Sequence, residues 1–264
     1  LVLERALKPG KKILISGGGR CNFTNIGAGP ANYLSSNPHF AKSALARYTQ
    51  WDFIDLVTQH GIAWHEKTLG QLFCDGSAKQ IVQMLLDECG ETVDVLCDAF
   101  VSAVVKDGDT FAVAASGQNF AAPNLVIATG GPSIPKMGAT GLAYEIATQF
   151  GLHVLDTRPG LVPFTFGADR FKPLAGVSVP ARISNAEASF DEALLFTHRG
   201  LSGPAVLQIS SYWREGEEIA VHLLPEVDLF VALREQRQQS GRKDLTTELA
   251  RHLPTRLVED LAAD

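Results

Sequence analysis

An acid at the end of a short apolar run, followed closely by a glycine-rich loop, is the feature that most constrains this chain. The acid is Glu4, and the loop is the stretch Ser16-Gly17-Gly18-Gly19-Arg20-Cys21-Asn22-Phe23-Thr24-Asn25. Three consecutive glycines leave the backbone bare, so its N–H groups can turn toward an anion. Arg20 adds a fork of donors for a phosphate or a flavin carbonyl. Dinucleotide-binding folds place at such a strand end the carboxylate that grips a ribose. Together these groups predict a dinucleotide cofactor.

The order of these elements is unusual for a Rossmann unit. In that unit a Gly-x-Gly-x-x-Gly loop precedes the acid by about twenty residues, whereas this chain opens at Leu1, only three residues before Glu4. We therefore expect that a strand, its phosphate-binding turn and the first helix lie upstream, outside the chain. The plainer interpretation is an ordinary buried strand followed by an ordinary tight loop.

Two further stretches carry candidate cofactor-binding residues. The apolar run 124–131 predicts a central strand that is buried on both faces. It ends in Thr129, Gly130 and Gly131, where backbone can approach a ligand at the carboxyl edge of a sheet, although a simple strand-to-loop turn has the same pattern. In the cationic stretch 8–12, Lys12 is favoured as a group that neutralises a pyrophosphate, but such a run is more often a solvated loop.

His198 is a weak candidate catalytic residue. It lies in the polar, glycine-rich stretch 196–204, where it could act as a general acid or base, or bind an acidic substrate together with Arg199. A turn at a strand end explains the same residues. The other six histidines show no ligand spacing, and we interpret them as surface or helix-end residues: His39, His60, His65, His153, His222 and His252.

The cysteines are scattered, with no Cys-x-x-Cys pair, so neither a zinc site nor a disulfide framework is indicated. Reduced thiols in a cytoplasmic protein are the simple interpretation. Cys21 has no partner cysteine beside it in the sequence, which favours a small buried hydrophobe over a redox thiol. The four are Cys21, Cys74, Cys89 and Cys97.

Hydrophobic periodicity divides the chain near residue 155. The first part, 1–155, predicts helices over 37–60, 77–89 (with Ser77 as N-cap) and 141–151, and short strands over 12–16, 62–66, 70–74, 93–96, 101–104 and 111–114. The turn at 107–109 indicates a hairpin. The second part, 156–264, is expected to be a mostly β domain to residue 225, with strands near 160–164, 177–180, 193–198 and 218–223. It would end in helices over 228–264 that break at Pro254.

Bulk composition limits the function classes. The 264 residues are 45% hydrophobic and 20% charged, which is typical of a soluble folded protein. The net charge of −6 argues against a nucleic-acid or anionic-membrane partner held by bulk charge. No apolar run is long enough to cross a bilayer, and no secretion leader is visible. We expect a small-molecule substrate.

The motifs resemble those of the BaiN/YhiN-like flavoproteins, also described as aminoacetone-oxidase-like. The resemblance is most specific over Lys8–Asn25 and extends to 65–73, 127–131, 160–164 and 194–204. It implies an α/β fold: a glutathione-reductase-like FAD-binding domain with an inserted β-rich domain. It would place Glu4 on the adenosine ribose, Gly17–Asn22 along the cofactor, Phe100 beside the adenine and Thr129–Gly131 over the pyrophosphate side.

The family's N-terminal glycine-motif strand and its C-terminal return to the FAD domain are both absent from this chain. We therefore expect a fragment of a longer protein, with domains 1–155 (partial FAD domain) and 156–264 (inserted β-rich domain). Such a fragment is expected to bind FAD weakly or not at all, because the pyrophosphate is normally bound by the missing turn.

The resemblance implies an FAD-dependent oxidoreductase that transfers hydride between a bound flavin and an unidentified small molecule, with use of NAD(P)H suggested by the family alone. The alternative is a non-catalytic flavin- or nucleotide-binding fragment. A third hypothesis, a phosphate-binding hydrolase, is weakened because the P-loop motif and a serine nucleophile elbow are both absent.

Overall fold

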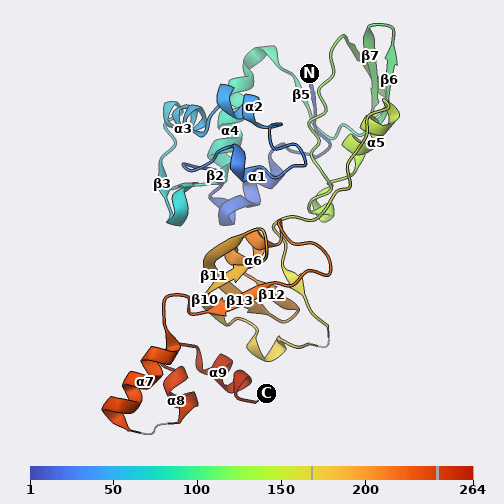
Figure 1. The fold of residues 1–264 in the computed structure, drawn as a ribbon. Coiled ribbons are helices and arrows are strands. Elements are labelled where there is room, and N and C mark those ends of the chain that lie inside the picture. The colour runs from blue at the N-terminus through green and yellow to red at the C-terminus, as the bar shows by residue number, and fades with distance from the viewer. Residues whose placement is uncertain (168, 242–243, 264) are drawn as a thin grey trace. The chain divides into compact units, whose positions relative to one another are not determined.

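The computed structural model describes residues 1–167, 169–241 and 244–263. The chain forms two compact units, an N-terminal unit (Leu1–Leu155) and a C-terminal unit (Asp156–Asp264) (Figure 1). The connection between their regular elements, from 152 to 163, contains no helix or strand.

The N-terminal unit combines three small sheets with five α-helices. The first sheet pairs β1 with β5 in parallel, the second is antiparallel in the order β2-β4-β3, and the third is the meander β6-β7-β8. The strands are β1 (Val2–Leu3), β2 (Asn22–Asn25), β3 (Trp64–Glu66), β4 (Gln71–Cys74), β5 (Val95–Leu96), β6 (Val101–Asp107), β7 (Thr110–Ala115) and β8 (Gln118–Ala122). The α-helices are α1 (Lys11–Ile15), α2 (Lys42–Arg47), α3 (Gln50–Gln59), α4 (Ala78–Cys89) and α5 (Leu142–Gln149).

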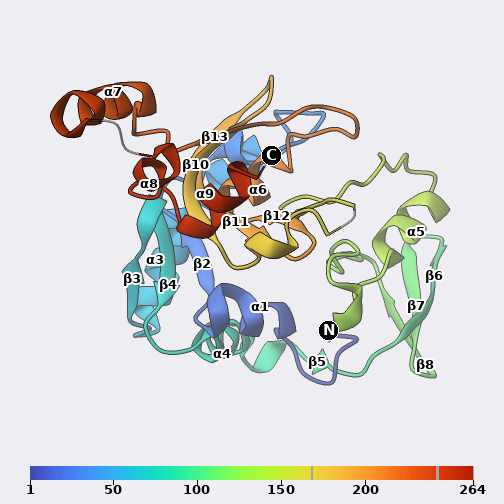
Figure 2. The same cartoon turned by 90° about the horizontal axis from the view of Figure 1, so that it is seen from below.

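The helix predicted over 77–89 is confirmed as α4. Ser77 caps it by accepting a hydrogen bond from the Lys79 N–H at 3.2 Å, which satisfies a donor that has no partner within the helix. Ala78, Ile81 and Met84 recur on one face and are buried. This face packs with Val57 of α3 in the main core of the unit. Figure 2 shows α3 alongside the β2-β4-β3 sheet.

The single helix predicted over 37–60 is wrong, because two helices, α2 and α3, share this segment. Thr49 is extended and forms a capping box with Asp52: the Thr49 N–H donates to Asp52 at 2.6 Å, and the Asp52 N–H donates back to the Thr49 hydroxyl. These hydrogen bonds from Thr49 lower the pKa of the Asp52 carboxyl. The extended Tyr48 and Thr49 end α2 and the cap starts α3, whereas the hydrophobic spacing continues across both helices and therefore predicted one.

The strand predicted over 12–16 is also wrong. These residues form helix α1, which begins after the left-handed turn at Gly10 (φ +78°). Ile13 and Leu14 pack against the α3–α4 core. A run of five residues carries too little periodicity to separate helix from strand, so tertiary packing decided the outcome.

The buried central strand predicted over 124–131 is not present. The segment is irregular, with Leu125 half-buried against the β6–β7 cluster but Val126 84% exposed. In the described part of the chain no strand lies beside it to take its backbone hydrogen bonds, and a strand without a neighbour gains nothing from its extended form.

The hairpin predicted at 107–109 is confirmed. Asp107 and Thr110 are the last pair of β6 and β7, and Gly108 has the positive φ (+56°) that a two-residue turn needs. The strands predicted over 62–66 and 70–74 are confirmed as β3 and β4, which pair with each other, and β2 joins them as a third strand. Helix α5 lies beside the meander, where Gln149 Nε2 donates to the Val104 carbonyl at 2.6 Å.

The C-terminal unit is built on an antiparallel sheet of five strands in the order β13-β10-β11-β12-β9. The strands are β9 (Phe164–Thr165), β10 (Ser178–Ser184), β11 (Ser189–Thr197), β12 (Gly200–Ser202) and β13 (Ala220–Leu223). The α-helices are α6 (Pro204–Ile209), α7 (Leu229–Ser240), α8 (Leu245–Leu249) and α9 (Thr255–Leu261). The strands predicted near 177–180, 193–198 and 218–223 are present with shifted ends, whereas only Phe164 of the predicted strand 160–164 lies in a strand. Pro254 separates α8 from α9 as predicted.

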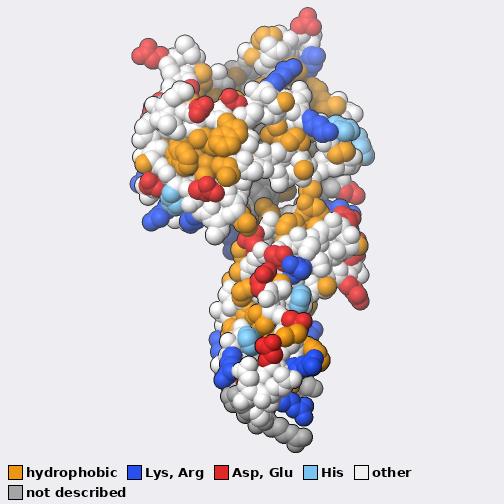
Figure 3. All heavy atoms as spheres, turned by 60° about the vertical axis from the view of Figure 1, so that its left-hand side comes forward, with side chains coloured by type: hydrophobic (Ala, Val, Ile, Leu, Met, Phe, Trp, Pro, Cys, Tyr) orange, Lys and Arg blue, Asp and Glu red, His pale blue; other side chains and the backbone are white. Residues whose placement is uncertain are grey.

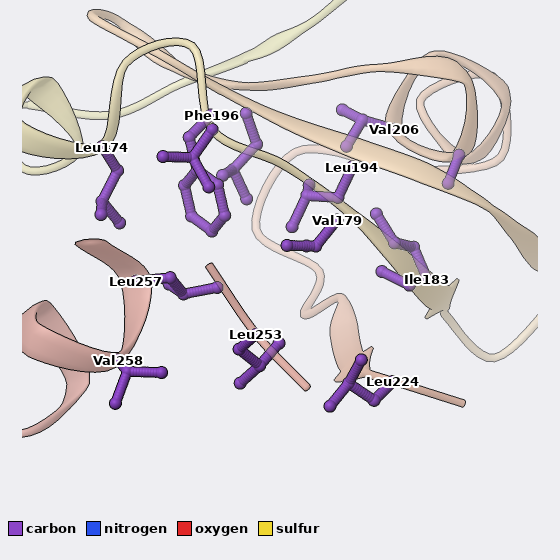
Figure 4. Packing of buried hydrophobic residues seen from close by; sticks show 14 of the residues in the cluster. Leu174, Val179, Ile183, Leu194, Phe196, Val206, Leu224, Leu253, Leu257 and Val258 are labelled. Carbon is purple, nitrogen blue, oxygen red and sulfur yellow. The ribbon is translucent and has the colours of Figure 1, made fainter. Parts of the chain in front are cut away.

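Alternation along β10 and β11 builds the core of the C-terminal unit. Val179, Ala181 and Ile183 are buried while their strand neighbours are exposed or half-buried, which is the period-two pattern of a sheet with one covered face. Leu194 lies opposite Val179 and is 1% exposed. Figure 4 shows these side chains together with those from the C-terminal helices, including Leu257 and Val258.

None of the helices in the described residues combines the length and the apolar character that a membrane-spanning helix requires.

Replacing Leu194 by alanine is expected to destabilise the C-terminal unit by about 2–5 kcal/mol, because it leaves a cavity in a packed core. Leu195 on the other face of the same strand is half-buried, so Leu195→Ala is the matched control and should cost clearly less. Urea unfolding followed by circular dichroism measures both. Equal losses would contradict the assigned covered face.

Brief chymotrypsin treatment is expected to cut first in the connection 152–163, after Leu152, Leu155 or Leu161, which are all exposed. Two lasting fragments should appear on a gel and in mass spectra. First cuts inside β10 or α4 would contradict an independent boundary here.

Candidate functional site

Glu4 and Phe100 lie next to each other in the N-terminal unit. Glu4 follows β1, and its carbonyl oxygen accepts the Ala99 N–H at 3.0 Å. One carboxylate oxygen accepts the Ala6 N–H at 2.8 Å, which restrains the side chain. The Arg5 guanidinium lies 5.4 Å from the centre of the exposed Phe100 ring. The contact with the Phe100 ring is therefore made by Arg5, while Glu4 meets this segment through its backbone, and these groups could together bind a ribose and its attached base.

Lys12 reaches the segment that follows the second glycine motif. Its Nζ donates to the Ser133 hydroxyl at 2.9 Å, two residues beyond Gly131. Gly131 packs against Tyr144, whose hydroxyl would lie 2.6 Å from any added Cβ. Thr129 and Gly130 are exposed. The structure therefore brings Lys12 close to Gly131, and the exposed cation could meet a phosphate there.

The glycine loop is crowded at one residue and open at the next. Gly17, Gly18 and Gly19 all have positive φ, from +56° to +87°. A Cβ on Gly17 would lie 2.7 Å from the Asn22 nitrogen and 2.7 Å from the Phe73 ring, whereas Gly18 has nothing within 4 Å. The loop thus rests on Phe73 through Gly17 and presents bare backbone at Gly18. This arrangement fits the close approach of a cofactor.

The residues after the triplet divide into buried and exposed. Arg20 and Asn22 are exposed, whereas Cys21 is only 5% exposed. Burial, with a smaller contribution from the neighbouring Cys21 thiol, raises the pKa of the Cys74 thiol to about 11. The Cys74 thiol is therefore protonated near neutral pH, which agrees with a structural rather than a nucleophilic role.

His198 lies in the C-terminal unit, in the turn between β11 and β12. Thr197 organises this turn, because its hydroxyl accepts the Arg199 and Gly200 N–H groups and donates to the Gly200 carbonyl. His198 and Arg199 are exposed beside a hollow of about 220 Å³, which also has Pro163, Phe164, Thr165, Thr197 and Ser202 in its lining. His198 therefore lies both in a turn at a strand end and beside a hollow. The residue types alone could not distinguish a purely structural turn from a catalytic or substrate-binding group.

One polar pair was missed by the sequence interpretation. His65 is neither at a helix end nor isolated: it lies on β3, and its Nδ1 is 2.6 Å from Asp75 Oδ1. Its ring stacks on Phe73, with centroids 6.2 Å apart and planes at 18°. The strands 62–66 and 70–74 were predicted without a register, and only their pairing in the structure places His65 opposite Phe73, with Asp75 just beyond the end of β4. His60, by contrast, does cap a helix, and its Nε2 is 2.8 Å from Glu88.

The surface around these groups carries both apolar and charged side chains. Phe40, Trp51 and Leu69 are more than half exposed in the N-terminal unit. Figure 3 shows hydrophobic side chains gathered in patches on this unit, with Lys and Arg interspersed with acids.

Comparison with known proteins supplies an independent line of evidence. The family described as "HI0933-like protein Rossmann domain" matches residues 1–216. The chain is 58% identical over 266 aligned positions, 99% of its length, to the ribosomal RNA dihydrouridine synthase of Escherichia coli strain K12. It is 48% identical over 98% of its length to the protein of that name from Haemophilus influenzae. In both cases the chain spans 66% of the relative's own length.

A third relative has a different name. The chain is 27% identical to the 3-dehydro-bile acid delta(4,6)-reductase of Clostridium scindens, over 86% of this chain and 58% of that protein.

Substitutions at Gly17 and Gly18 should have different effects. Gly17→Ala is expected to lower stability by about 1–3 kcal/mol, because the added Cβ collides with backbone and with Phe73 at a positive φ. In Gly18→Val the added Cβ has none of the described residues within 4 Å, so the main cost is the backbone strain of about 1–2 kcal/mol, but the substitution should release bound flavin. Urea unfolding and the ratio of flavin to protein absorbance separate the two effects.

Gly61 also has a positive φ and open space, so Gly61→Val is the control for strain without a cofactor role. Full flavin retention in Gly18→Val would show that the cofactor does not approach this loop.

Proposed function

Because the chain belongs to the family of HI0933-like proteins with a Rossmann domain, we propose that it forms the greater part of a flavin-dependent reductase. That family is associated with FAD binding and oxidoreductase activity, in agreement with the function implied by the sequence motifs. FAD would be held by Glu4 at the ribose, by Lys12 near the phosphates and by Gly17–Asn22 along the flavin end.

The names of the relatives point to one type of chemistry. Dihydrouridine is uridine with two hydrogens added across a carbon–carbon double bond conjugated with a ring carbonyl. A 3-dehydro bile acid with double bonds at positions 4 and 6 also has its double bonds conjugated with a carbonyl. We propose that this protein reduces a carbon–carbon double bond of that kind, with electrons supplied by NAD(P)H through the flavin.

The substrate we propose is a uracil base in ribosomal RNA. The observation that carries this choice is the 58% identity over 99% of the chain to the E. coli dihydrouridine synthase, against 27% to the bile acid reductase. It departs from the expectation of a small-molecule substrate, and it gives the protein a nucleic-acid partner.

An RNA partner is compatible with a net charge of −6 because the charges are distributed unevenly. Between residues 1 and 50 the chain has a single acid, Glu4, and seven cations: Arg5, Lys8, Lys11, Lys12, Arg20, Lys42 and Arg47. In the described part of the chain, the ion pairs all lie outside this segment. A local positive surface can meet RNA phosphates even when the whole chain is acidic.

The chain's own residues would bind and orient the reactants. The flavin supplies hydride chemistry when bound. The open backbone at Gly18 would let the flavin approach, while Arg20 donates to its carbonyl oxygens or phosphates. The C-terminal unit, taken by itself, offers His198 and Arg199 as donors beside the apolar wall of Phe164, a combination that could bind a nucleotide of the RNA.

The test is reduction of uridine by the flavin-loaded protein. With NADPH or NADH and ribosomal RNA from a strain that lacks the modification, nucleoside mass spectrometry should detect dihydrouridine, and the reduced flavin should be reoxidised only when that RNA is added. Reoxidation by a steroid 4,6-dien-3-one instead would assign the bile-acid type of substrate. A protein that folds, binds flavin and reduces neither would favour the non-catalytic alternative.

A further inference from the structure

We propose that His65 and Asp75 form the proton-donating pair of this reductase, a role that rests on the function proposed above. Reduction of a conjugated double bond needs a hydride at one carbon and a proton at the other. The flavin is the source of the hydride, so the chain must supply or relay the proton. Among the described groups near the glycine loop, the His65–Asp75 pair has the geometry for this task.

The geometry of the pair is that of an oriented imidazole. Nδ1 of His65 is 2.6 Å from Asp75 Oδ1. An ionised Asp75 accepts the Nδ1–H, which orients the ring and leaves Nε2 as the end that exchanges protons. Asp75 is itself anchored, because its backbone N–H donates to the Ala63 carbonyl at 2.9 Å. The His65 side chain is 36% exposed, so a substrate can reach it.

The position of the pair links it to the glycine loop. His65, Phe73 and Asn22 form one row across the three strands β3, β4 and β2, because His65 lies opposite Phe73 and Phe73 opposite Asn22. Paired residues in a row share a face of the sheet, and neighbouring strands are about 4.8 Å apart. Gly17 rests on the Phe73 ring that stacks on His65. The loop and the imidazole therefore contact the same ring.

The charged and titratable neighbours of His65 are few. On its own strand Glu66 points to the opposite face, and Lys67 follows with its Nζ 4.1 Å from the centre of the Phe73 ring. On the neighbouring segment they are Cys74, the last residue of β4, and Asp75, which directly follows the strand. Cys74 is fully buried and its thiol is protonated, so it cannot exchange protons with a ligand.

The step balances with the reductant already named. Hydride from the reduced flavin adds to the carbon β to the carbonyl, and the π electron pair of the double bond becomes available at the α carbon. That pair takes the proton from Nε2 of doubly protonated His65, and a C–H bond forms. His65 is left neutral and regains its proton from water. The flavin is left oxidised and is reduced again by NAD(P)H.

The experiment separates the two half-reactions in the flavin-loaded protein by stopped-flow absorbance. His65→Ala should leave flavin content and flavin reduction by NAD(P)H within about twofold of wild type, and should slow reoxidation by the RNA substrate by about 10²-fold or more. Added imidazole should restore part of that rate. Asp75→Asn should slow reoxidation less, because the imidazole remains but loses its orientation.

His60→Asn is the matched control, since His60 also pairs with a carboxylate in the same unit but sits at the end of α3. It should leave both half-reactions unchanged. A second readout is independent of turnover: long-range ¹H–¹⁵N spectra of the flavin-loaded protein should show a protonated Nδ1 on His65, and Asp75→Asn should alter that signal.

Each outcome bears on the proposal. Unchanged reoxidation in His65→Ala, or equal slowing of both half-reactions without imidazole rescue, would overturn the donor role while leaving the reductase function standing. A wild-type protein that binds flavin but reduces neither uridine nor a steroid dienone would overturn the proposed function and the donor role with it.

Discussion

The contact between Gly17 and the Phe73 ring is the interaction on which the candidate site depends. No side chain fits at Gly17, so the loop can settle directly onto the β2-β4-β3 sheet. The next residue, Gly18, is exposed, and β2 begins at Asn22 directly after the loop. The same ring stacks on His65, so one aromatic side chain fixes both the proposed flavin approach and the proposed proton donor. A substitution of Phe73 would therefore disturb the glycine loop and the His65 ring together, even though Phe73 carries no polar group.

The C-terminal unit depends on a different constraint, the close approach of neighbouring strands at its glycines. A Cβ on Gly203 would lie 2.5 Å from the Ala193 carbonyl oxygen, and one on Gly200 would run into the Phe164 carbonyl. These two positions hold β12 between β11 and β9, next to the turn that carries His198 and Arg199. Both strands that flank this turn contribute buried side chains to the hydrophobic core of the unit, so the packed sheet holds the turn in place.

Predictions from sequence succeeded where one local signal was sufficient. Ser77 caps a helix whose apolar spacing is regular, and Gly108 closes a hairpin, so both elements were predictable. The segments 12–16 and 124–131 failed because short apolar runs fit either structure, and packing against other elements decided each one. The candidate loop was found because consecutive glycines are rare outside tight turns. The His65–Asp75 pair was missed because its partners come together only through strand pairing.

The hollow in the C-terminal unit has an optical property that follows from its wall. Phe164 lines the hollow, and its ring meets Trp213 edge to face with centroids 5.1 Å apart. The chain has three tryptophans, and Trp213 is the one in this unit. A base or other ring entering the hollow would displace Phe164 or change the polarity around it, and the indole would sense that change. The intrinsic emission of Trp213, isolated by replacing Trp51 and Trp64 with phenylalanine, is thus a built-in reporter of occupancy that needs neither flavin nor turnover.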